Sequence, residues 1–168
     1  MQNYTTVEIH SFTLLLLFIF YFLLKIFRIW RYYKNKSLLN RNRTLKKLKS
    51  LSWDDFERLS MELFTKLGWV VVGNEQKGAD GGVDIWMEKK FLMSKNITAI
   101  VQCKRYEDAS VTVKVVREMY GLMHEHSVDE VYIVTTSRFT KECYAFVKDK
   151  NIILINGTIL VRLISKYR

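Results

Sequence analysis

The sequence predicts a mixed α/β domain that is preceded by one transmembrane helix. Three observations indicate this arrangement: an apolar run near the N-terminus, three strand patterns in succession, and strands that alternate with helices in the second half. The 168 residues leave room for one compact domain of about 100–150 residues and an appendage. With 49% hydrophobic and 14% aromatic residues and no Pro, the chain is neither disordered nor fibrous.

The apolar run covers Phe12–Leu24, where Thr13 is the one polar residue, and it widens to Val7–Phe27 if its polar flanks are included. Helical residues rise about 1.5 Å each, so the wider segment spans roughly 31 Å, enough to cross a hydrocarbon core. No basic residue precedes Lys25 and no small-residue cleavage site follows, so an uncleaved anchor fits better than a signal peptide. A buried core helix is the alternative, because Glu8 and Lys25 bring charge into the segment.

Basic residues are concentrated after the apolar run. Ten Lys or Arg and no acid lie between Lys25 and Lys49, whereas Glu8 is the only charge before the run. Residues 1–49 therefore carry +9 of the total +10, and residues 50–168 carry +1 with seventeen bases and sixteen acids. Topology and attraction to anionic lipid explain the basic stretch, although it could also hold nucleic acid near the folded domain.

The positive-inside rule predicts a single-pass protein of the cell membrane, with its N-terminus outside and its folded domain in the cytoplasm. The expected division is an extracytoplasmic N-terminus at 1–6, a transmembrane helix at 7–27, a basic juxtamembrane linker at 28–50 and the folded domain at 51–168. Cys103 and Cys143 are too few for a disulfide framework and, with three His, do not form a zinc cluster. This cysteine usage suits a reducing compartment.

The first elements of the folded domain are predicted to be one helix and three strands. Ser52 can cap a helix whose apolar residues recur at helical spacing up to Leu67, and Gly68 ends it. Strand patterns separated by turn-forming residues follow at Trp69–Val72, Val83–Met87 and Ile97–Lys104. We expect these three strands to form an antiparallel meander.

Helices and strands alternate in the rest of the chain. Ser110 or Thr112 can cap a helix that runs to about His124. The remaining predicted elements are a buried strand at Val131–Thr135, a helix at Thr140–Lys150, a buried strand at Ile152–Ile155 and a helix at Thr158–Tyr167 after an Asn-Gly turn. This order predicts a mixed sheet that is covered by helices.

Three residues of the predicted meander could carry chemistry. By the two-residue period of a strand, Gln102 and Lys104 share one face, about 6.5–7 Å apart. On the preceding strand, Val83 and Ile85 are expected on one side and Asp84 on the other. A hairpin register can bring Asp84 beside Gln102, although the sequence does not determine that register.

Oxygen atoms at these positions suit a hard divalent cation such as Mg²⁺, with Mn²⁺ as a substitute. The candidate ligands are the Asp84 carboxylate, the Gln102 side-chain carbonyl and the backbone carbonyl of Cys103, whose own side chain is expected in the core. A cation there would polarise a phosphoryl oxygen and activate a water, while Lys104 would orient that water and offset negative charge. A Gln-x-Lys tripeptide is common, however, and the exposed end of a strand is the alternative interpretation.

The loop before Asp84 contains Gly78, Gly81 and Gly82 within five residues. Glycine permits positive φ and a close approach of backbone, which a solvated turn rarely needs three times in so short a segment. The loop is therefore a candidate for part of a functional site, and on local grounds a solvated turn is an equally open interpretation.

Six blocks of the sequence resemble the Mrr-type catalytic domain of the restriction endonuclease-like PD-(D/E)XK nuclease superfamily. The blocks are Leu51–Glu57, Leu67–Trp69, Gly78–Asp84, Val101–Tyr106, Val134–Thr140 and Ile155–Gly157. They occur in a consistent order over about Leu51–Tyr167, so together they are far more specific than any one of them. The resemblance implies a restriction-endonuclease-like core, with a mixed sheet in αβββαβ order flanked by helices.

The resemblance assigns the first carboxylate of the motif to Asp84 and the catalytic lysine to Lys104. It places Gln102 where the superfamily usually has an acid, which is the Q-x-K variant of Mrr-type domains and leaves one fewer negative charge on the metal. Glu57 could supply the missing carboxylate, as acids of the first helix do in related nucleases. Its alternative role is to complement the helix dipole in the first turn.

The function implied is a membrane-tethered, Mg²⁺-dependent endonuclease that restricts foreign or methylated double-stranded DNA. Arg105, Arg138 and Lys141 are candidate DNA contacts, because the last two lie where a strand passes into a helix. Membrane lipid is the second expected partner. A homodimer or a separate specificity subunit is expected to supply recognition. A catalytically inactive nuclease fold that binds DNA or acts as a membrane adaptor is the alternative.

Overall fold

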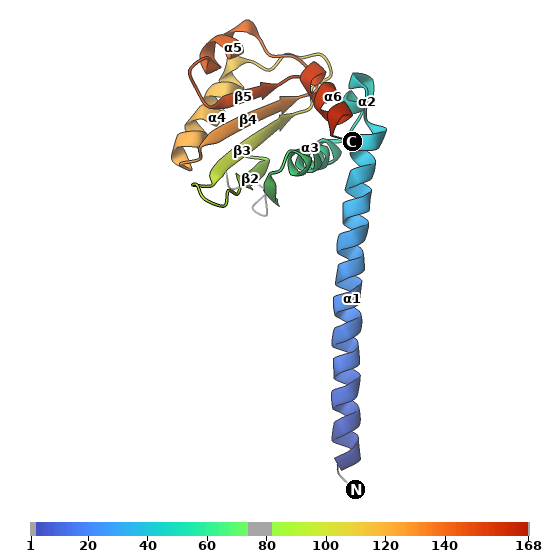
Figure 1. Cartoon of the computed structure of the whole chain (residues 1–168). Coiled ribbons are helices and arrows are strands. Elements are labelled where there is room, and N and C mark those ends of the chain that lie inside the picture. The colour runs from blue at the N-terminus through green and yellow to red at the C-terminus, as the bar shows by residue number, and fades with distance from the viewer. Residues whose placement is uncertain (1–2, 74–81, 168) are drawn as a thin grey trace. The chain divides into compact units, whose positions relative to one another are not determined.

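The computed structural model describes residues 3–73 and 82–167, and the chain divides into two compact units, Met1–Ser37 and Leu38–Arg168. Helix α1 (Asn3–Arg41) forms the described part of the first unit and ends within the second (Figure 1). The second unit contains all the other helices and strands of the described residues.

Within α1, the window Thr13–Trp30 has a mean hydropathy of 2.0 over 18 residues, and none of these residues is buried. By length and composition this helix could cross a membrane. Its large apolar side chains are exposed from Leu14 through Trp30, which does not fit the alternative of a buried core helix.

From residue 53 onward the second unit follows the predicted order of elements, whereas a short helix at Leu45–Lys49, in the expected linker, was not predicted. Its helices are α2 (Leu45–Lys49), α3 (Trp53–Lys66), α4 (Val113–Glu125), α5 (Lys141–Val147) and α6 (Gly157–Lys166). Its strands are β1 (Val70–Gly73), β2 (Ile85–Lys89), β3 (Ile97–Lys104), β4 (Glu130–Thr135) and β5 (Ile152–Ile155). The strands form one sheet in the order β1-β2-β3-β4-β5, in which β1, β2 and β3 are antiparallel and β4 and β5 are parallel to β3. The mixed sheet in αβββαβ order is therefore confirmed.

Helices cover both faces of the sheet (Figure 1). The side chains of Val101 and Cys103 pack in the core on the α3 and α6 side, whereas Ile100 and Ile133 pack in the core on the α4 and α5 side. All four are completely buried, and burial of one such aliphatic side chain stabilises the fold by roughly 1.5–3 kcal/mol. The alternation predicted for β3 is thus observed, and it sends neighbouring residues into separate cores.

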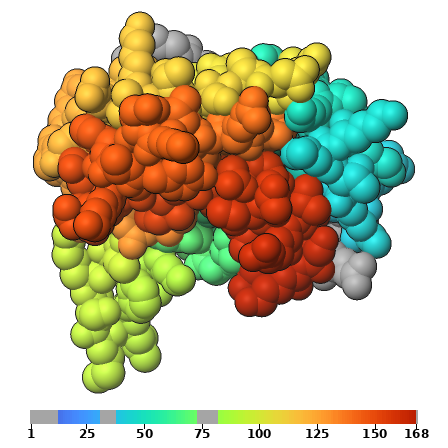
Figure 2. All heavy atoms as spheres, turned by 90° about the horizontal axis from the view of Figure 1, so that it is seen from above, coloured from blue at the N-terminus to red at the C-terminus, as the bar shows by residue number. Residues whose placement is uncertain are grey.

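Residues expected to lie in a linker contribute to the core. Leu39, near the end of α1, and Leu48 of α2 are 1% and 0% exposed and pack with α3 and α6. Figure 2 shows this segment, in cyan, beside α6 in red. The second unit thus begins at Leu38, before the boundary expected at residue 51.

Local signals explain where the helices begin. Ser52 Oγ accepts a hydrogen bond from Asp55 N–H at 3.1 Å, which caps α3 as predicted. Asn156 Oδ1 accepts from Ile159 N–H at 3.0 Å, so the Asn-Gly pair expected to form a turn is the N-terminus of α6. Thr112 occupies the cap position of α4 without a side-chain capping bond.

Asp129 fastens the beginning of β3 to the loop before β4. Its carboxylate accepts hydrogen bonds from Lys95 Nζ at 2.8 Å and from the backbone N–H and hydroxyl of Thr98, each at 2.9 Å. These bonds hold the pKa of Asp129 at about 2. Sequence reasoning did not identify this clamp, because its members are 31 or more residues apart in the chain.

Gly157 is placed where only hydrogen fits. A Cβ at this position would lie 2.6 Å from the backbone oxygen of Thr136 and 2.5 Å from Leu45 Cδ1. The Gly157 N–H also donates to Ser137 O at 2.9 Å, which joins the start of α6 to the end of β4. The close approach of α6 to β4 and α2 therefore requires glycine.

We predict that Gly157→Ala lowers the free energy of unfolding by about 1–3 kcal/mol, because the backbone of Thr136 must shift to admit a methyl group. Gly121→Ala in α4 is the matched control, since no atom lies within 4 Å of its added Cβ. There the gain in helix propensity should raise stability by up to about 1 kcal/mol. Urea denaturation of both variants measures the two changes in the free energy of unfolding. An unchanged free energy of unfolding in Gly157→Ala would contradict the close contact.

Candidate active site

Strand β2 begins with an irregularity at Asp84. Its N–H donates to Val101 O at 3.0 Å, yet Ile85 is the residue that pairs with Val101 in the ladder. Two residues opposite one is the arrangement of a β-bulge, which bends a strand and redirects side chains. The regular one-to-one pairing of residues between β2 and β3 is thus interrupted at Asp84.

The side chains of Val83 and Ile85 point in other directions than the sequence predicted. Val83 and Ile85 were expected on the same side of a strand that begins at Val83. Instead, Val83 packs with Ile100 in the α4 and α5 core, and Ile85 packs with Val101 in the α3 and α6 core. The strict period of two fails because the extra residue at the bulge inverts the alternation. The regular strand consequently begins at Ile85.

The bulge places the Asp84 carboxylate against β3. Asp84 Oδ2 accepts hydrogen bonds from the side-chain amide of Gln102 and from the backbone N–H of Cys103, the latter at 2.6 Å. Gln102 is only 6% exposed, so this contact lies in the interior of the domain. The expected neighbourhood of Asp84 and Gln102 is therefore present in the structure.

Lys104 is the last residue of β3 and is half-buried. By strand alternation its side chain lies on the same face as that of Gln102. Its backbone carbonyl accepts from Thr135 Oγ1 at 2.7 Å and from the Thr136 N–H at 3.4 Å. The end of β3 that carries Lys104 is thus held firmly by the end of β4.

The pKa of the Cys103 thiol depends on its burial and on the charged residues near it. Burial raises the pKa of the Cys103 thiol well above its usual value, and the negative charge of Asp84 raises it further. A hydrogen bond with Ser60 and the positive charge of Lys104 act in the opposite direction, and the charge of Glu57 again raises the pKa. The thiol therefore remains protonated and belongs to the core, as expected.

Glu57 lies on the helix that packs against the Cys103 side of β3. It is half-buried on α3, one turn before Ser60, whose hydroxyl contacts the Cys103 thiol. Glu57 therefore approaches the sheet from the α3 side, whereas the side chains of Gln102 and Lys104 lie on the other face of β3.

Gly82 approaches Gln102 closely. It has a φ of +112°, and a Cβ there would lie 3.4 Å from Gln102 Oε1. At this distance a Cβ would make an ordinary contact with the amide, but the positive φ would strain any side chain at this position. Gly78 and Gly81, with the rest of the loop from 74 to 81, lie outside the described residues.

The donor atoms fit a hard cation after one adjustment. In residues 3–73 and 82–167, no three His, Cys, Asp or Glu side chains form a metal-binding group. The available oxygens are those of Asp84, Glu57, the Gln102 amide and the Cys103 backbone, which are ligand types that Mg²⁺ prefers. Gln102 now presents its amide nitrogen to Asp84. A half-turn of the amide would place two oxygens side by side, an arrangement that a cation between them stabilises.

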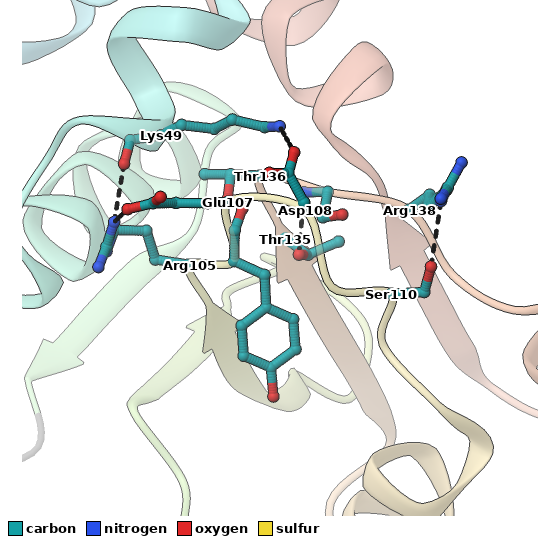
Figure 3. A network of polar contacts seen from close by, with 10 residues as sticks. Lys49, Arg105, Glu107, Asp108, Ser110, Thr135, Thr136 and Arg138 are labelled. Atoms are coloured by element: carbon teal, nitrogen blue, oxygen red, sulfur yellow. Dashed lines mark hydrogen bonds and ion pairs between the residues drawn. The ribbon is translucent and has the colours of Figure 1, made fainter.

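The three candidate DNA-contacting residues differ in whether they already form contacts within the domain. Arg105 donates to Lys49 O at 2.7 Å, lies 3.6 Å from Glu107 and is 21% exposed (Figure 3). Its guanidinium therefore serves mainly to hold α2. Arg138 and Lys141 are exposed at the passage from β4 to α5.

A comparison with protein families matches residues 48–164 to Mrr_cat, described as a restriction endonuclease. The chain belongs to the Mrr_cat restriction endonuclease family. This match covers the whole sheet and the helices α3 to α5, so the family assignment and the fold agree. Among curated proteins, none matches the chain.

Two solved structures are similar to this Mrr_cat chain. The DNA modification-dependent restriction endonuclease AspBHI has a TM-score of 0.57 at 20% identity, over 79% of this chain and 35% of its own. The MspJI restriction endonuclease, in complex with a 27-mer oligonucleotide, has a TM-score of 0.52 at 18% identity, over 79% and 30%. The chain thus corresponds to about a third of each protein. At these identities the likeness establishes a restriction-endonuclease-like fold.

We predict that Gly82→Ala is less active than its control in a DNA cleavage assay, because the added Cβ strains a positive φ two residues before Asp84 and beside the Gln102 amide. Gly68→Ala is the matched control, since Gly68 also has a positive φ, +86°, but no atom lies within 4 Å of its added Cβ. Both variants should lose about 1–2 kcal/mol of stability. Equal cleavage by the two, at equal folded fraction, would contradict a role for Gly82 in the site.

Proposed function

We propose that the chain is a membrane-tethered, metal-dependent endonuclease that hydrolyses phosphodiester bonds of double-stranded DNA. The observation that carries the proposal is the contact of Asp84 with Gln102, two residues before Lys104, in a chain of the Mrr_cat family. The MspJI structure contains an oligonucleotide, which supports DNA as the substrate. The name of AspBHI supports restriction of modified, for example methylated, DNA.

The cation of the proposed site is Mg²⁺, which Mn²⁺ can replace. Asp84, the turned amide of Gln102 and the Cys103 backbone carbonyl hold it, and Glu57 adds the second carboxylate. When bound, the cation polarises a phosphoryl oxygen and lowers the pKa of its water. With Asp84 and Glu57 the ligands carry two negative charges, which balance a divalent cation despite the neutral Gln102.

Lys104 is the proposed positioning cation for the reaction. Its side chain shares a face of β3 with that of Gln102. Its backbone carbonyl is hydrogen-bonded to β4, so the backbone from which the ammonium group extends is held in place. There it orients the water that attacks phosphorus and offsets the negative charge that develops on the phosphoryl oxygens. The attack displaces the opposite oxygen, so one P–O bond forms as another breaks.

The proposed location is the cell membrane, with α1 as the single anchor, the N-terminus outside and the catalytic domain in the cytoplasm. The apolar window Thr13–Trp30 and the ten basic residues that follow Leu24 support this orientation. Membrane lipid is then one partner. A homodimer or a specificity subunit is proposed to select the DNA.

The catalytic assignment predicts that Asp84→Asn and Lys104→Ala each reduce plasmid cleavage by about 100-fold or more, because each removes a group that acts on the transition state. The full chain in detergent micelles should be assayed on methylated and unmethylated plasmid, with Mg²⁺ and with EDTA. Lys90→Ala, at the far end of the β2–β3 hairpin, is the charge-matched control. EDTA should abolish cleavage.

Glu57→Gln in the same assay should raise the Mg²⁺ concentration needed for half-maximal cleavage. Asp55→Asn, in the first turn of α3, is its control and should affect stability alone. Full activity of both Asp84→Asn and Lys104→Ala would refute the site. DNA binding that persists without any cleavage in the wild type would establish the inactive, DNA-binding alternative.

The anchor predicts that the chain resists alkaline carbonate extraction from membranes. The double substitution Leu16→Lys and Phe20→Lys should release it, because each charge at the centre of a bilayer costs about 2.5–3.5 kcal/mol. Leu16→Ile with Phe20→Leu is the apolar control and should remain in the membrane pellet. Release of the wild-type chain by carbonate would contradict the anchor.

A further inference from the structure

A pocket of about 270 Å³ lies between α2, the loop after β3, the end of β4 and the start of α6. Its polar lining consists of two cations, three hydroxyl residues and one carboxylate: Lys49, Arg138, Thr136, Ser137, Thr158 and Asp108. Figure 3 shows Lys49 reaching toward Asp108 above the ends of β3 and β4. The composition suits an oxyanion with several acceptor oxygens.

Lys49 is fixed at its base and weakly held at its tip. Its carbonyl accepts from Arg105 at 2.7 Å, which anchors the end of α2. Its Nζ lies 3.2 Å from Asp108 Oδ1, and the Asp108 side chain is 97% exposed. An exposed ion pair of this kind contributes at most about 1 kcal/mol, so an incoming anion can displace Asp108 readily.

Arg138 contributes a guanidinium to the lining of the pocket. Its Nε donates to Ser110 Oγ at 3.1 Å, which orients the group. Within residues 3–73 and 82–167 no hydrogen bond or ion pair engages its two terminal nitrogens, which can donate to two oxygens of one phosphate. The side chain is exposed and can therefore meet a ligand from solvent.

The start of α6 adds neutral donors. Thr158 is in the first turn of this ten-residue helix, and its hydroxyl lines the pocket together with that of Ser137. The positive end of the helix dipole favours an anion here. The Thr136 hydroxyl is already committed, because it donates to Tyr106 O at 2.6 Å.

The pocket is joined to the catalytic strand. Thr135 Oγ1 donates to Lys104 O and Thr136 Oγ1 donates to Tyr106 O, so the segment from Lys104 to Asp108 is fastened to the end of β4 (Figure 3). Lys104 and Asp108 are only four residues apart. The pocket lining and Lys104 therefore belong to one connected region at the ends of β3 and β4.

We infer that this pocket binds a backbone phosphate of the DNA, and that the Asp108 carboxylate occupies the position of the phosphate on Lys49 when DNA is absent. The choice of DNA as the source of the phosphate rests on the proposed function. A lipid phosphate is disfavoured because the pocket is continuous with the segment that follows Lys104.

Binding of a short duplex by the full chain in neutral detergent with EDTA, measured by anisotropy over a range of salt, tests the inference. Lys49→Gln and Arg138→Gln should each weaken binding and reduce the slope of log K against log salt by about 0.9. Asp108→Asn should tighten binding by about 1.5- to 5-fold, because an internal competitor is removed. Lys90→Gln, outside the pocket, should match the wild type.

Unchanged affinity and salt slope in Lys49→Gln and Arg138→Gln, or weaker binding by Asp108→Asn, would overturn the inference while leaving the proposed nuclease intact. A wild type that binds no DNA would overturn both. If short-chain phosphatidylglycerol raises the melting temperature and Arg138→Gln removes that shift while DNA binding is unchanged, the pocket is a lipid site and the DNA assignment is wrong. Because the Asp108 side chain is exposed to solvent, Asp108→Asn should fold as the wild type does, and its DNA binding can be compared directly.

Discussion

Asp84 is bound to β3 through both its backbone and its side chain, and the candidate site depends on this double attachment. The N–H bond to Val101 O creates the bulge, and the bulge turns the carboxylate toward Gln102 and the Cys103 N–H. In a regular hairpin the Asp84 side chain would stand on one face of the sheet. The bulge instead places the Asp84 carboxylate against the backbone of β3. There a carboxylate, an amide and a backbone carbonyl could bind one cation.

A helix and a strand support this arrangement. Helix α3 packs Ser60 against the Cys103 thiol on one face of β3. Beside β3, β4 holds the backbone of Lys104 and Tyr106 through two threonine hydroxyls. The strand that carries Gln102 and Lys104 is thus held by packing on one face and by hydrogen bonds along one edge.

The basic segment before the folded domain has two parts with different roles. Its last residue, Lys49, belongs to the second unit and shares a pocket with Arg138 and the start of α6. Of the other nine bases, Lys25 and Arg28 lie within the apolar window of α1 and seven follow it. Attraction to anionic lipid is the role proposed for them. The nearly neutral net charge of residues 50–168 is compatible with a local anion site, because Lys49 lies outside that range and shares one pocket with Arg138.

The sequence by itself determined the order of the elements from α3 onward and the mixed sheet, because hydrophobic periodicity and helix caps are local properties. It also predicted the face of β3 that Gln102 and Lys104 share, but it left open the hairpin register that brings Asp84 beside Gln102. Only the tertiary structure decided the bulge at Asp84, which inverted the expected side of Val83, since a single hydrogen bond to Val101 is invisible in a strand pattern. It also decided that Arg105 holds α2, and that Leu39 and Leu48 enter the core. The same limit hid the meeting of Lys49 with Arg138, because residues 89 positions apart share a pocket only after the sheet brings their ends together.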